Sequence, residues 1–572
     1  MTSNTLRKEF LNFFEKRGHK IVSSSSLIPT DPSVLFTTAG MQQFKEYFLG
    51  KEFPYGENVA TSQKCFRTSD IEEVGDENHL TFLEMLGNFS FGGYFKETAT
   101  KLAYEFLFKE LKLPLEKAIF TVFAGNKDVP EDKESAEIWK KLGIPENRIK
   151  KCGKEDNFWG PTGEEGPCGP TTEIHFNNTE IWNLVFNEYF QDKNGKLTLL
   201  KQKGVDTGMG LERLAMVVQN KNSVYETDLF APIINEISGG LKEQRSSLAS
   251  AKTSANEKER RIIADHIKSS VFLITEGILP SNVERGYVLR RILRRAIRYG
   301  KLLNLSKNFL IPLAQRVIEI YKEIYPEVKS KETDILTVIQ NEEEKFERTL
   351  QEGLKRFEKL LAIGLNVEGT FELYATYGFP LELTKELAKE RGISVDIEGF
   401  KEEFKKHQEI SRAGVEKKFG GGGEFSPKLH TATHLLHAAL RKVLGEHVKQ
   451  MGSDINLQRL RFDFSHPKKI TEEEIKKVED LVNQKIKESL EIRKEEMPYS
   501  EAIKSGALAF FKEKYPEIVT VYSTCSKNSG QVFSKEICAG PHVKRTSELG
   551  HFKIIKEESS GAAIRRIRAI LE

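Results

Sequence analysis

The sequence is poor in cysteine and has no long apolar run, and both absences narrow the class of protein. Five cysteines in 572 residues are too few and too scattered for a disulfide framework. No apolar run approaches the roughly 20 residues that span a bilayer. Residues 1–18 are amphipathic and contain acids, so they lack the apolar core of a signal peptide. We therefore expect a cytoplasmic protein with no membrane partner.

The sequence also lacks a strong excess of one charge. The formal net charge is +3, from 87 Lys and Arg against 84 Asp and Glu, so nucleic-acid binding would need a local basic patch. An apolar content of 38% and a charged content of 30% are typical of a folded globular chain. The nucleotide-binding patterns GxGxxG and GxxxxGKS/T are both absent. A nucleotide site would therefore need a different fold.

Residues 60–96 predict a β-hairpin with an arginine close to an aromatic residue. A strand ends at Arg67, a polar loop follows, and an apolar return strand begins near Leu80. An antiparallel return places Arg67 near Phe82 across the ladder, where a guanidinium could bind a phosphate and a ring could stack on a base. The alternative is a surface hairpin with an ordinary core phenylalanine.

The spacing of the elements predicts an α+β protein of several domains. Hairpin-like spacings in residues 1–240 predict a mostly antiparallel sheet flanked by helices, rather than a βαβ repeat. Residues 239–261 are polar and resemble a linker with some helix, and residues 260–415 are almost wholly helical in period, which predicts a helical domain at 241–415. A glycine-rich linker at 416–427 precedes an α+β module at 428–572.

The helical region contains one strongly basic segment. Between Tyr287 and Lys301 there are five arginines and no acid. The five are Arg290, Arg291, Arg294, Arg295 and Arg298. Helical spacing places them on one broad face. Such a face is often only solvated or paired with acids, but the lack of an intervening acid favours contact with a phosphate backbone.

The C-terminal module contains two residue pairs that could bind a metal. His430 and His434 lie four positions apart, hence on one helix face, and Cys538 and His542 follow far downstream. Three imidazoles and a thiolate suit a tetrahedral zinc site. A lone HxxxH is a weak signal, and His437 is a competing ligand. Four protein ligands would make a structural site, whereas an open position could activate a hydrolytic water. The sequence leaves both open.

Eight segments, in order, resemble motifs of the alanyl-tRNA synthetase family of class II synthetases. They are FTTAGMQQFKEYFLG, TFLEMLGNFSFGGYFK, DNFWG with GPCGP, EIWNLVF, VDTGMGLER, RGYVLRRILRRA, HTATHLLHAALRKVLG and RLRFDFSH. The resemblance covers nearly the whole chain. It implies a catalytic domain at 1–240, a helical domain at 241–415 that binds the tRNA acceptor stem, and an editing domain at 428–572. The implied substrates are alanine, ATP with Mg²⁺, and tRNA(Ala).

The resemblance also implies roles for single residues. Arg67 would bind the α-phosphate and the amino-acid carboxylate, and Arg213 would bind the γ-phosphate and cover the adenine. Phe82 would stack on the other side of the adenine. Asp206 would pair with the alanine ammonium. The other residues expected at the alanine and nucleotide sites are His79, Trp159, Asn183, Val185 and Gly208.

A second site is expected because a small apolar pocket separates alanine from glycine or serine by only about 1–3 kcal/mol. The resemblance implies that the editing domain hydrolyses seryl- and glycyl-tRNA at a Zn²⁺ centre. Its ligands would be His430, His434, Cys538 and His542.

The chain departs from the family pattern at several points. The family reads a G·U pair of the acceptor stem with an asparagine and an aspartate; Asn282 matches the first, whereas Ala375 stands at the second position. Pro541 replaces a small or hydroxylated residue in CAGPHV, and GPCGPTTE lacks a second cysteine. The usual β-barrel before the editing domain and the C-terminal dimerisation region are both missing, from which we expect a monomer.

Two other functions remain open. One is an editing-only hydrolase of misacylated tRNA, and the other is a non-catalytic tRNA-binding paralogue. The presence of Arg67, Asp206 and Arg213 disfavours both, because neither function needs them. A threonyl-type enzyme shares the HxxxH and CxxxH module, but there the module precedes the catalytic domain.

Overall fold

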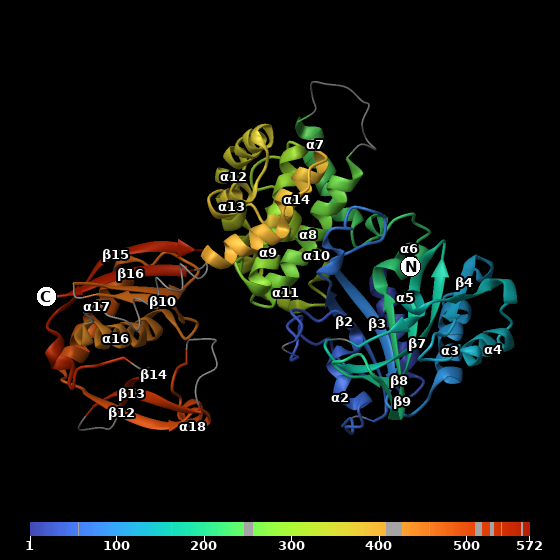
Figure 1. Cartoon of the computed structure of the whole chain (residues 1–572), viewed down its shortest axis with the longest axis horizontal. Helices are drawn as coiled ribbons and strands as arrows, with labels where there is room; N and C mark the ends of the chain where they lie inside the picture. The colour runs from blue at the N-terminus through green and yellow to red at the C-terminus, as the bar shows by residue number, and fades with distance from the viewer. Residues whose placement is uncertain are drawn as a thin grey trace. The chain divides into compact units, whose positions relative to one another are not determined.

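The computed structural model describes the whole chain except residues 32, 55, 162, 245–255, 408–425, 457, 510–516, 527–530, 539 and 562–563. The predicted glycine-rich linker at 416–427 lies almost wholly outside the described residues. The chain forms two compact units (Figure 1). The first contains Met1–Leu361 and Leu373–Ile393, and the second contains Ala362–Glu372 and Ser394–Glu572. The first unit thus joins the predicted catalytic domain to most of the predicted helical domain, and the boundary at 240 stays a prediction.

In the part of the first unit that the structure describes, nine strands form one sheet, in the order β1-β2-β3-β9-β8-β7-β4-β5, with β6 paired to β7. The strands are β1 (Lys20–Ile21), β2 (Asn58–Phe66), β3 (Phe82–Ser90), β4 (Ala118–Phe123), β5 (Ile149–Cys152), β6 (Phe158–Trp159), β7 (Gly166–Phe176), β8 (Thr179–Gln191) and β9 (Leu197–Gly210). Only the pairs β1–β2 and β4–β5 among these strands are parallel. The predicted antiparallel sheet flanked by helices is confirmed.

Short helices flank this sheet. They are α1 (Ser3–Glu15), the 3₁₀ turn η1 (Gly40–Phe44), α2 (Lys45–Phe48), α3 (Lys96–Tyr104), α4 (Lys133–Lys141), α5 (Lys154–Asn157), α6 (Leu211–Val218) and α7 (Ala231–Gln244). The helix α1 begins where the Thr2 side chain accepts a hydrogen bond from the amide of Thr5. Its residues Phe10 and Phe14 are one turn apart, and both pack on Trp182 of β8. This aromatic contact fixes α1 to the sheet.

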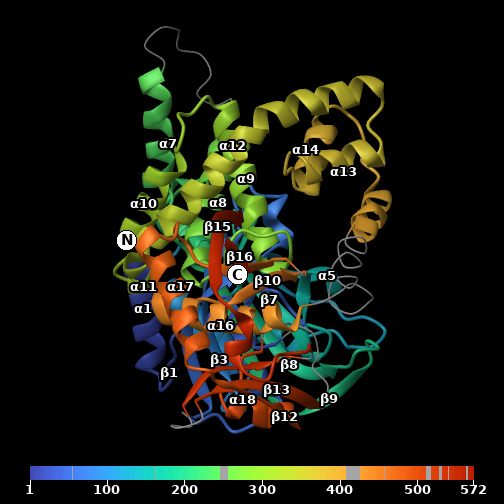
Figure 2. The same ribbon diagram turned by 90° about the vertical axis from the view of Figure 1, so that its left-hand side faces the viewer.

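A set of longer helices completes the first unit (Figures 1 and 2). They are α8 (Glu257–Thr275), α9 (Glu284–Leu302), α10 (Leu310–Tyr321), α11 (Pro326–Ser330), α12 (Glu332–Ile363) and α14 (Leu381–Glu390). The helix α13 (Val367–Ala375) is divided between the two units, and most of it belongs to the second. The helix α8 is buried at every position from Ile262 to Thr275. It is enclosed because it packs on α9 and α10 and also on the sheet, where Phe272 stacks on Phe82 of β3.

The second unit pairs helices with two small sheets. Its sheets have the orders β10-β11-β16-β15 and β12-β13-β14. Its elements are α16 (Pro427–Leu444), β10 (Gln450–Ile455), β11 (Leu460–Ser465), α17 (Glu472–Lys487), β12 (Glu491–Pro498), α18 (Tyr499–Lys504), β13 (Ile518–Cys525), β14 (Val532–Ile537), β15 (Phe552–Gly561) and β16 (Ile564–Leu571). Thr471 and Glu474 form a capping box that starts α17. Leu435, Phe462 and Val478 lie in the shared core of α16, β11 and α17. Across the described parts of the chain, no helix is both long and apolar enough to cross a membrane.

Candidate functional site

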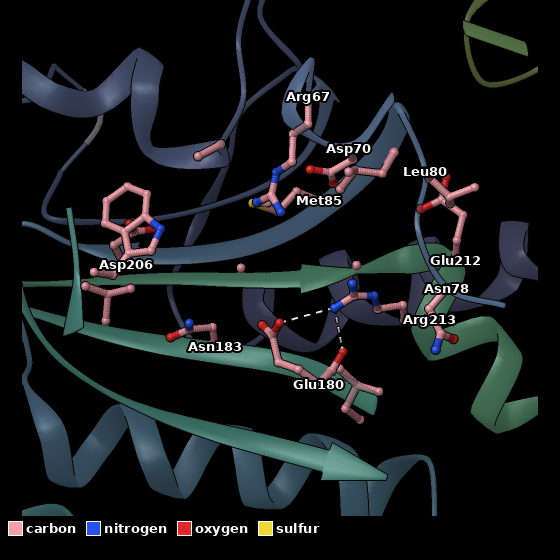
Figure 3. Close-up of a pocket in the computed structure, with 17 residues that line it drawn as sticks. Arg67, Asp70, Asn78, Leu80, Met85, Glu180, Asn183, Asp206, Glu212 and Arg213 are labelled. Carbon is pink, nitrogen blue, oxygen red and sulfur yellow. Dashed lines mark hydrogen bonds and ion pairs between the residues drawn. The ribbon is translucent and has the colours of Figure 1, made fainter. Parts of the chain in front are cut away.

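A pocket of about 200 Å³ opens on one face of the large sheet (Figure 3). Side chains alternate between the two faces of a strand, so residues two positions apart line the same wall. The lining residues that alternate along the strands are Leu83 and Met85 of β3, Ile181, Asn183 and Val185 of β8, and Asp206, Gly208 and Gly210 of β9. Trp159 of β6 and Glu180 of β8 also line the pocket. The register pairs Val185 with Asp206 and Asn183 with Gly208, which brings the two walls together.

Two arginines lie at this pocket (Figure 3). Arg67 directly follows β2, and its Nε donates to the carbonyl of Thr38 at 3.2 Å. Arg213, in the first turn of α6, donates through Nη1 to the carbonyl and the carboxylate of Glu180 at 3.0 and 3.2 Å. Among the described residues, neither Nη of Arg67 has a partner. Two anchored guanidiniums beside one cavity suit a polyphosphate, which each could bind with paired N–H groups.

Asp206 is a buried carboxyl group on the pocket wall. Only 5% of the residue is exposed, and burial raises the pKa of its carboxyl to about 8. No lysine or arginine within the described part of the chain forms an ion pair with it. A buried carboxyl without a cation is well suited to receive the ammonium group of a small ligand.

The space near Asp206 is small and largely apolar. Trp159 and Val185 line it, and a side chain at Gly208 would meet Met85 Sδ at 2.9 Å. Asn183 donates through Nδ2 to Glu173 Oε1 at 2.9 Å, while its Oδ1 has no partner among the described residues. The structure therefore brings together five of the residues predicted for the alanine site.

The structure corrects the prediction for Phe82. Its ring is fully buried on the opposite face of β3, 3.9 Å from the ring of Phe272 and nearly parallel to it. The register pairs Phe82 with Phe66, so Arg67 lies one position further along and its side chain points to the other face. Phe82 is therefore an ordinary core phenylalanine, as the alternative interpretation of the hairpin expected. The next residue, Leu83, faces the pocket instead.

His79 lies beside the pocket without lining it. Its Nδ1 is 2.5 Å from Asp76 Oδ2, and 39% of its side chain is exposed. The neighbouring residues Asn78 and Leu80 line the pocket instead. The loop that precedes β3 thus faces the cavity with the residues on either side of His79.

Sequence reasoning missed four polar residues of the pocket, which are Asp70, Asn78, Glu180 and Glu212. Glu212 forms a fully buried ion pair of 2.7 Å with Lys268 of α8. Its position directly before the predicted Arg213 was a usable signal. Asp70 and Asn78 lie in a loop whose path the sequence does not specify.

The five arginines of α9 do not form an exposed basic face, which corrects the prediction of phosphate-backbone contact. Arg294, Arg295 and Arg298 are at most 5% exposed. Their partners are Glu342 on α12, at 2.6 Å, and Glu386 and Glu390 on α14, at 3.0 and 2.6 Å. Arg290 and Arg291 also pair with acids, Glu342 and Glu72. The main partners of the three buried arginines lie 48 to 92 positions downstream, so the local sequence gave no sign of them.

The two positions expected to read the acceptor stem are both exposed. Asn282 accepts a hydrogen bond from Arg290 through its Oδ1. Ala375 is the last residue of α13. A methyl side chain there offers no hydrogen bond to a base, so recognition of a G·U pair stays a prediction.

A second cluster lies in the second unit, where four potential ligands converge. His430 and His434 project from α16, Cys538 follows β14, and His542 lies in the next loop. One ligand atom from each lies within 4.8 Å of all the others. Cys538 Sγ is 3.3 Å from His430 Nε2.

The surroundings of these imidazoles suit metal binding. The Nδ1 of His430 lies 3.2 Å from the carbonyl of Pro541, and the Nδ1 of His542 lies 3.1 Å from Thr431 Oγ1. These contacts turn each Nε2 towards the cluster. His542 Nε2 is buried and has no partner among the described residues, as expected of a nitrogen that binds a metal.

The protonation of the cluster also fits a metal site. Burial lowers the pKa of His430 to about 4 and that of His542 to about 2, and it lowers the pKa of His434 as well. All three imidazoles are then neutral near pH 7, as metal ligands must be. The competing candidate His437 instead bonds to Glu536 at 2.9 Å. Three nitrogens and one thiolate are a donor set for zinc.

Known proteins resemble the chain along its whole length. Residues 5–456 match the family described as tRNA synthetases class II (A), and residues 519–568 match the threonyl and alanyl tRNA synthetase second additional domain. Alanine–tRNA ligases of Borrelia hermsii and Treponema denticola are each 48% identical, over 100% of this chain and 100% and 99% of their own lengths. That of Thermotoga maritima is 40% identical over 100% of this chain and 80% of its own length. The chain belongs to the alanyl-tRNA synthetase family of class II synthetases.

Proposed function

We propose that the chain is an alanine–tRNA ligase. The alanine carboxylate attacks the α-phosphorus of ATP, which releases pyrophosphate and leaves alanyl-adenylate. A hydroxyl of the 3′-terminal ribose of tRNA(Ala) then attacks the carbonyl carbon and releases AMP. The observation that carries this proposal is the pocket of about 200 Å³, which combines two arginines with a buried carboxyl group.

The two arginines would stabilise charge on the phosphates. Negative charge grows on the α-phosphate as the carboxylate attacks, and anchored guanidiniums oppose it without having to reorganise. Arg67 would bind the α-phosphate and the alanine carboxylate, and Arg213 would bind the γ-phosphate. ATP would enter with Mg²⁺, which neutralises part of the phosphate charge.

The residues around Asp206 would select alanine. Asp206 would pair with the ammonium, Asn183 would offer its free Oδ1, and Trp159, Val185 and Gly208 would surround the methyl group. With Phe82 buried elsewhere, the base would have to lie against other residues of the pocket. Leu80 and Leu83 are apolar residues that line it.

The proposal is tested by ATP–pyrophosphate exchange with alanine, glycine, serine and threonine. We expect exchange with alanine to exceed that with glycine and serine by about 10- to 100-fold, because a small apolar pocket discriminates by only about 1–3 kcal/mol. Absence of exchange with all four amino acids would contradict the proposal. It would favour the editing-only hydrolase or the non-catalytic tRNA-binding paralogue.

We further propose that the second unit hydrolyses seryl- and glycyl-tRNA. Limited selectivity in the first pocket makes a second, hydrolytic site useful. The His430, His434, Cys538 and His542 cluster would hold Zn²⁺. Bound zinc would supply a Lewis acid that positions the ester or lowers the pKa of a water molecule.

Replacing Cys538 with alanine is expected to reduce bound zinc from about one ion per chain to below a tenth, because a thiolate is the strongest zinc ligand of this set. Elemental analysis of the purified chain measures this. Cys525→Ala is the matched control, since Cys525 lies on β13 outside the cluster, and it should retain zinc. Seryl-tRNA deacylation should fall only in Cys538→Ala, with alanine-dependent exchange unchanged. If the wild-type chain contained no bound metal after purification in the presence of zinc, the metal assignment would be wrong.

The monomeric state and the cytoplasmic location stay predictions. The choice of tRNA also stays a prediction. Because the five arginines of α9 form ion pairs with acids, contacts with the acceptor stem would need other residues, such as the exposed Asn282.

A further inference from the structure

Residues 67–81, here called the pocket loop, connect β2 to β3 and form one side of the pocket. The loop contributes Arg67, Asp70, Asn78 and Leu80 to the pocket lining. Both of its ends must therefore be held in place if these side chains are to meet a ligand in a defined geometry.

One end of the pocket loop is held by an acid of α8. Asp265 is fully buried, and its Oδ1 accepts from the backbone amide of Thr81 at 2.9 Å. Its Oδ2 accepts from Thr81 Oγ1 at 2.6 Å. A carboxylate that takes two bonds from one residue fixes both the backbone and the side chain at that point.

The first part of the pocket loop is held at Ile71 by Arg295 of α9, which also connects to Asp265. Arg295 Nη1 donates to the carbonyl of Ile71 at 3.0 Å and lies 3.0 Å from His266 Nε2. His266 Nδ1 is 2.9 Å from Asp265 Oδ2. Because a guanidinium can only donate, Nε2 must accept and Nδ1 must carry the proton that Asp265 accepts. The four groups thus form one connected set of hydrogen bonds, in which Arg295 donates to His266, and both His266 and Thr81 donate to Asp265.

The surroundings keep this chain in one protonation state. Burial lowers the pKa of the fully buried His266, with the charge of Arg295 acting in the same direction, so the imidazole stays neutral and Nε2 can accept. At its outer end, Arg295 Nη2 donates to Glu386 Oε1 of α14 at 3.0 Å. A buried guanidinium with this acid partner keeps its charge.

We propose that Asp265, His266 and Arg295 are positioning residues for the nucleotide side of the pocket, acting through Ile71 in the first part of the pocket loop and Thr81 at its end. None of the three lines the pocket. Among the described residues, none of their hydrogen bonds or ion pairs reaches the alanine side, which is formed by β8, β9 and Trp159. The inference rests on the proposed function, because the nucleotide is assigned there.

The consequence is a separation between the two substrates. A shift of about 1 Å in a positioned group can reduce a rate about 100-fold. Loss of a hydrogen bond to the pocket loop should therefore raise the KM for ATP and lower kcat. The KM for alanine should change much less, because only the alanine carboxylate would contact the loop, through Arg67, whose side chain is held separately by the carbonyl of Thr38. A merely structural role would lower thermal stability and affect both substrates alike.

The test compares Arg295→Lys and Thr81→Val with Arg294→Lys. Lysine at 295 cannot reach Ile71, His266 and Glu386 together, and valine at 81 removes only the hydroxyl contacts with Asp265 and Ser269. We expect kcat/KM for ATP in the exchange reaction to fall about 10- to 100-fold in Arg295→Lys and about 3- to 10-fold in Thr81→Val. The KM for alanine should change less than about twofold.

Arg294→Lys is the matched control. Arg294 is buried on the same helix to the same 5% exposure, but its partners are Glu342 and the carbonyl of Gly378, not the pocket loop. It should lower the melting temperature about as much as Arg295→Lys and leave kcat/KM for ATP unchanged.

Two outcomes would overturn the inference: an unchanged KM for ATP in both loop variants, or equal changes in the KM for ATP and for alanine. ATP affinity, measured by calorimetry on the same variants, gives a readout that does not depend on alanine activation. A wild-type chain that binds ATP but shows no exchange would count against the proposed function. The ratio of ATP affinities between variant and wild type would still test the positioning role.

Discussion

Replacing Arg67 with alanine is expected to lower alanine-dependent ATP–pyrophosphate exchange about a thousandfold. A single preorganised donor to a developing charge contributes about 10²–10³ in rate, and an arginine on a transferring phosphoryl group contributes about 10³–10⁵. Arg67 is expected to serve both the α-phosphate and the carboxylate. Its anchoring bond to the carbonyl of Thr38 leaves both Nη groups for these contacts.

The control for this variant is Arg67→Lys, which keeps the charge but loses the fork. We expect it to be intermediate, because lysine can neutralise one oxygen without bridging two groups. Thermal unfolding should change little in either variant, since the side chain of Arg67 is half-buried and makes one hydrogen bond. Exchange in Arg67→Ala within about tenfold of the wild type would show that the arginine is not at the reacting phosphate.

Replacing Asp206 with asparagine is expected to raise the KM for alanine about a hundredfold and leave the KM for ATP nearly unchanged. Removing one member of a buried charge pair costs about 2–5 kcal/mol, because the other charge is left without its partner. Here that other charge is the ammonium of alanine. Exchange kinetics at varied alanine and saturating ATP measure the effect. An unchanged KM for alanine would place the ammonium elsewhere.

The same residue predicts a pH dependence. In the empty pocket, burial raises the pKa of Asp206 to about 8, so most of its carboxyl groups are protonated at lower pH. Pairing with an ammonium requires the carboxylate, hence kcat/KM for alanine should rise about tenfold per unit between about pH 6 and pH 8, then level off. The slope should disappear in Asp206→Asn. A profile that is identical in the two proteins would contradict this assignment.

Stability should change in the opposite direction to activity. The folded-state pKa of Asp206 lies above its unfolded value near 3.9, so the neutral carboxyl contributes stability that is fully present below that value. This contribution is lost as the pH rises through about 8. Asp206→Asn should therefore unfold at a higher temperature than the wild type above that pH. Lower activity together with higher stability would separate a role in binding from a folding defect.

The sequence predicted the catalytic sheet and most of the pocket, because both depend on local patterns. Hairpin spacings specified the antiparallel strands, and the resemblance of short segments to motifs of the family indicated Arg67, Asp206 and Arg213. The prediction for Phe82 was wrong because adjacency across a ladder does not determine which face a side chain occupies. That depends on the register, and a difference of one position reverses the face.

The basic segment of α9 shows a different limit. Its sequence contains no acid, yet every one of its five arginines has an acidic partner from another part of the chain. Pairing over such separations depends on how helices pack, which helical periodicity alone does not report. By contrast, the HxxxH and CxxxH pairs predicted a contact between distant parts of the chain. The prediction was possible because imidazole and thiolate groups bind the same metal, and the structure does bring the four side chains together.

The chain passes between its two units more than once, and this order determines where it can be cut without breaking ion pairs of the first unit. It leaves the first unit after Leu361, returns at Leu373 and leaves again after Ile393. The segment Leu373–Ile393 contains Glu386 and Glu390, which form the ion pairs with Arg295 and Arg298. A fragment cut at the first exit would keep every strand of the catalytic sheet and yet leave two buried guanidiniums uncompensated, at about 3–5 kcal/mol each. A fragment that keeps both ion pairs must therefore include residues 362–372 and extend at least to Glu390.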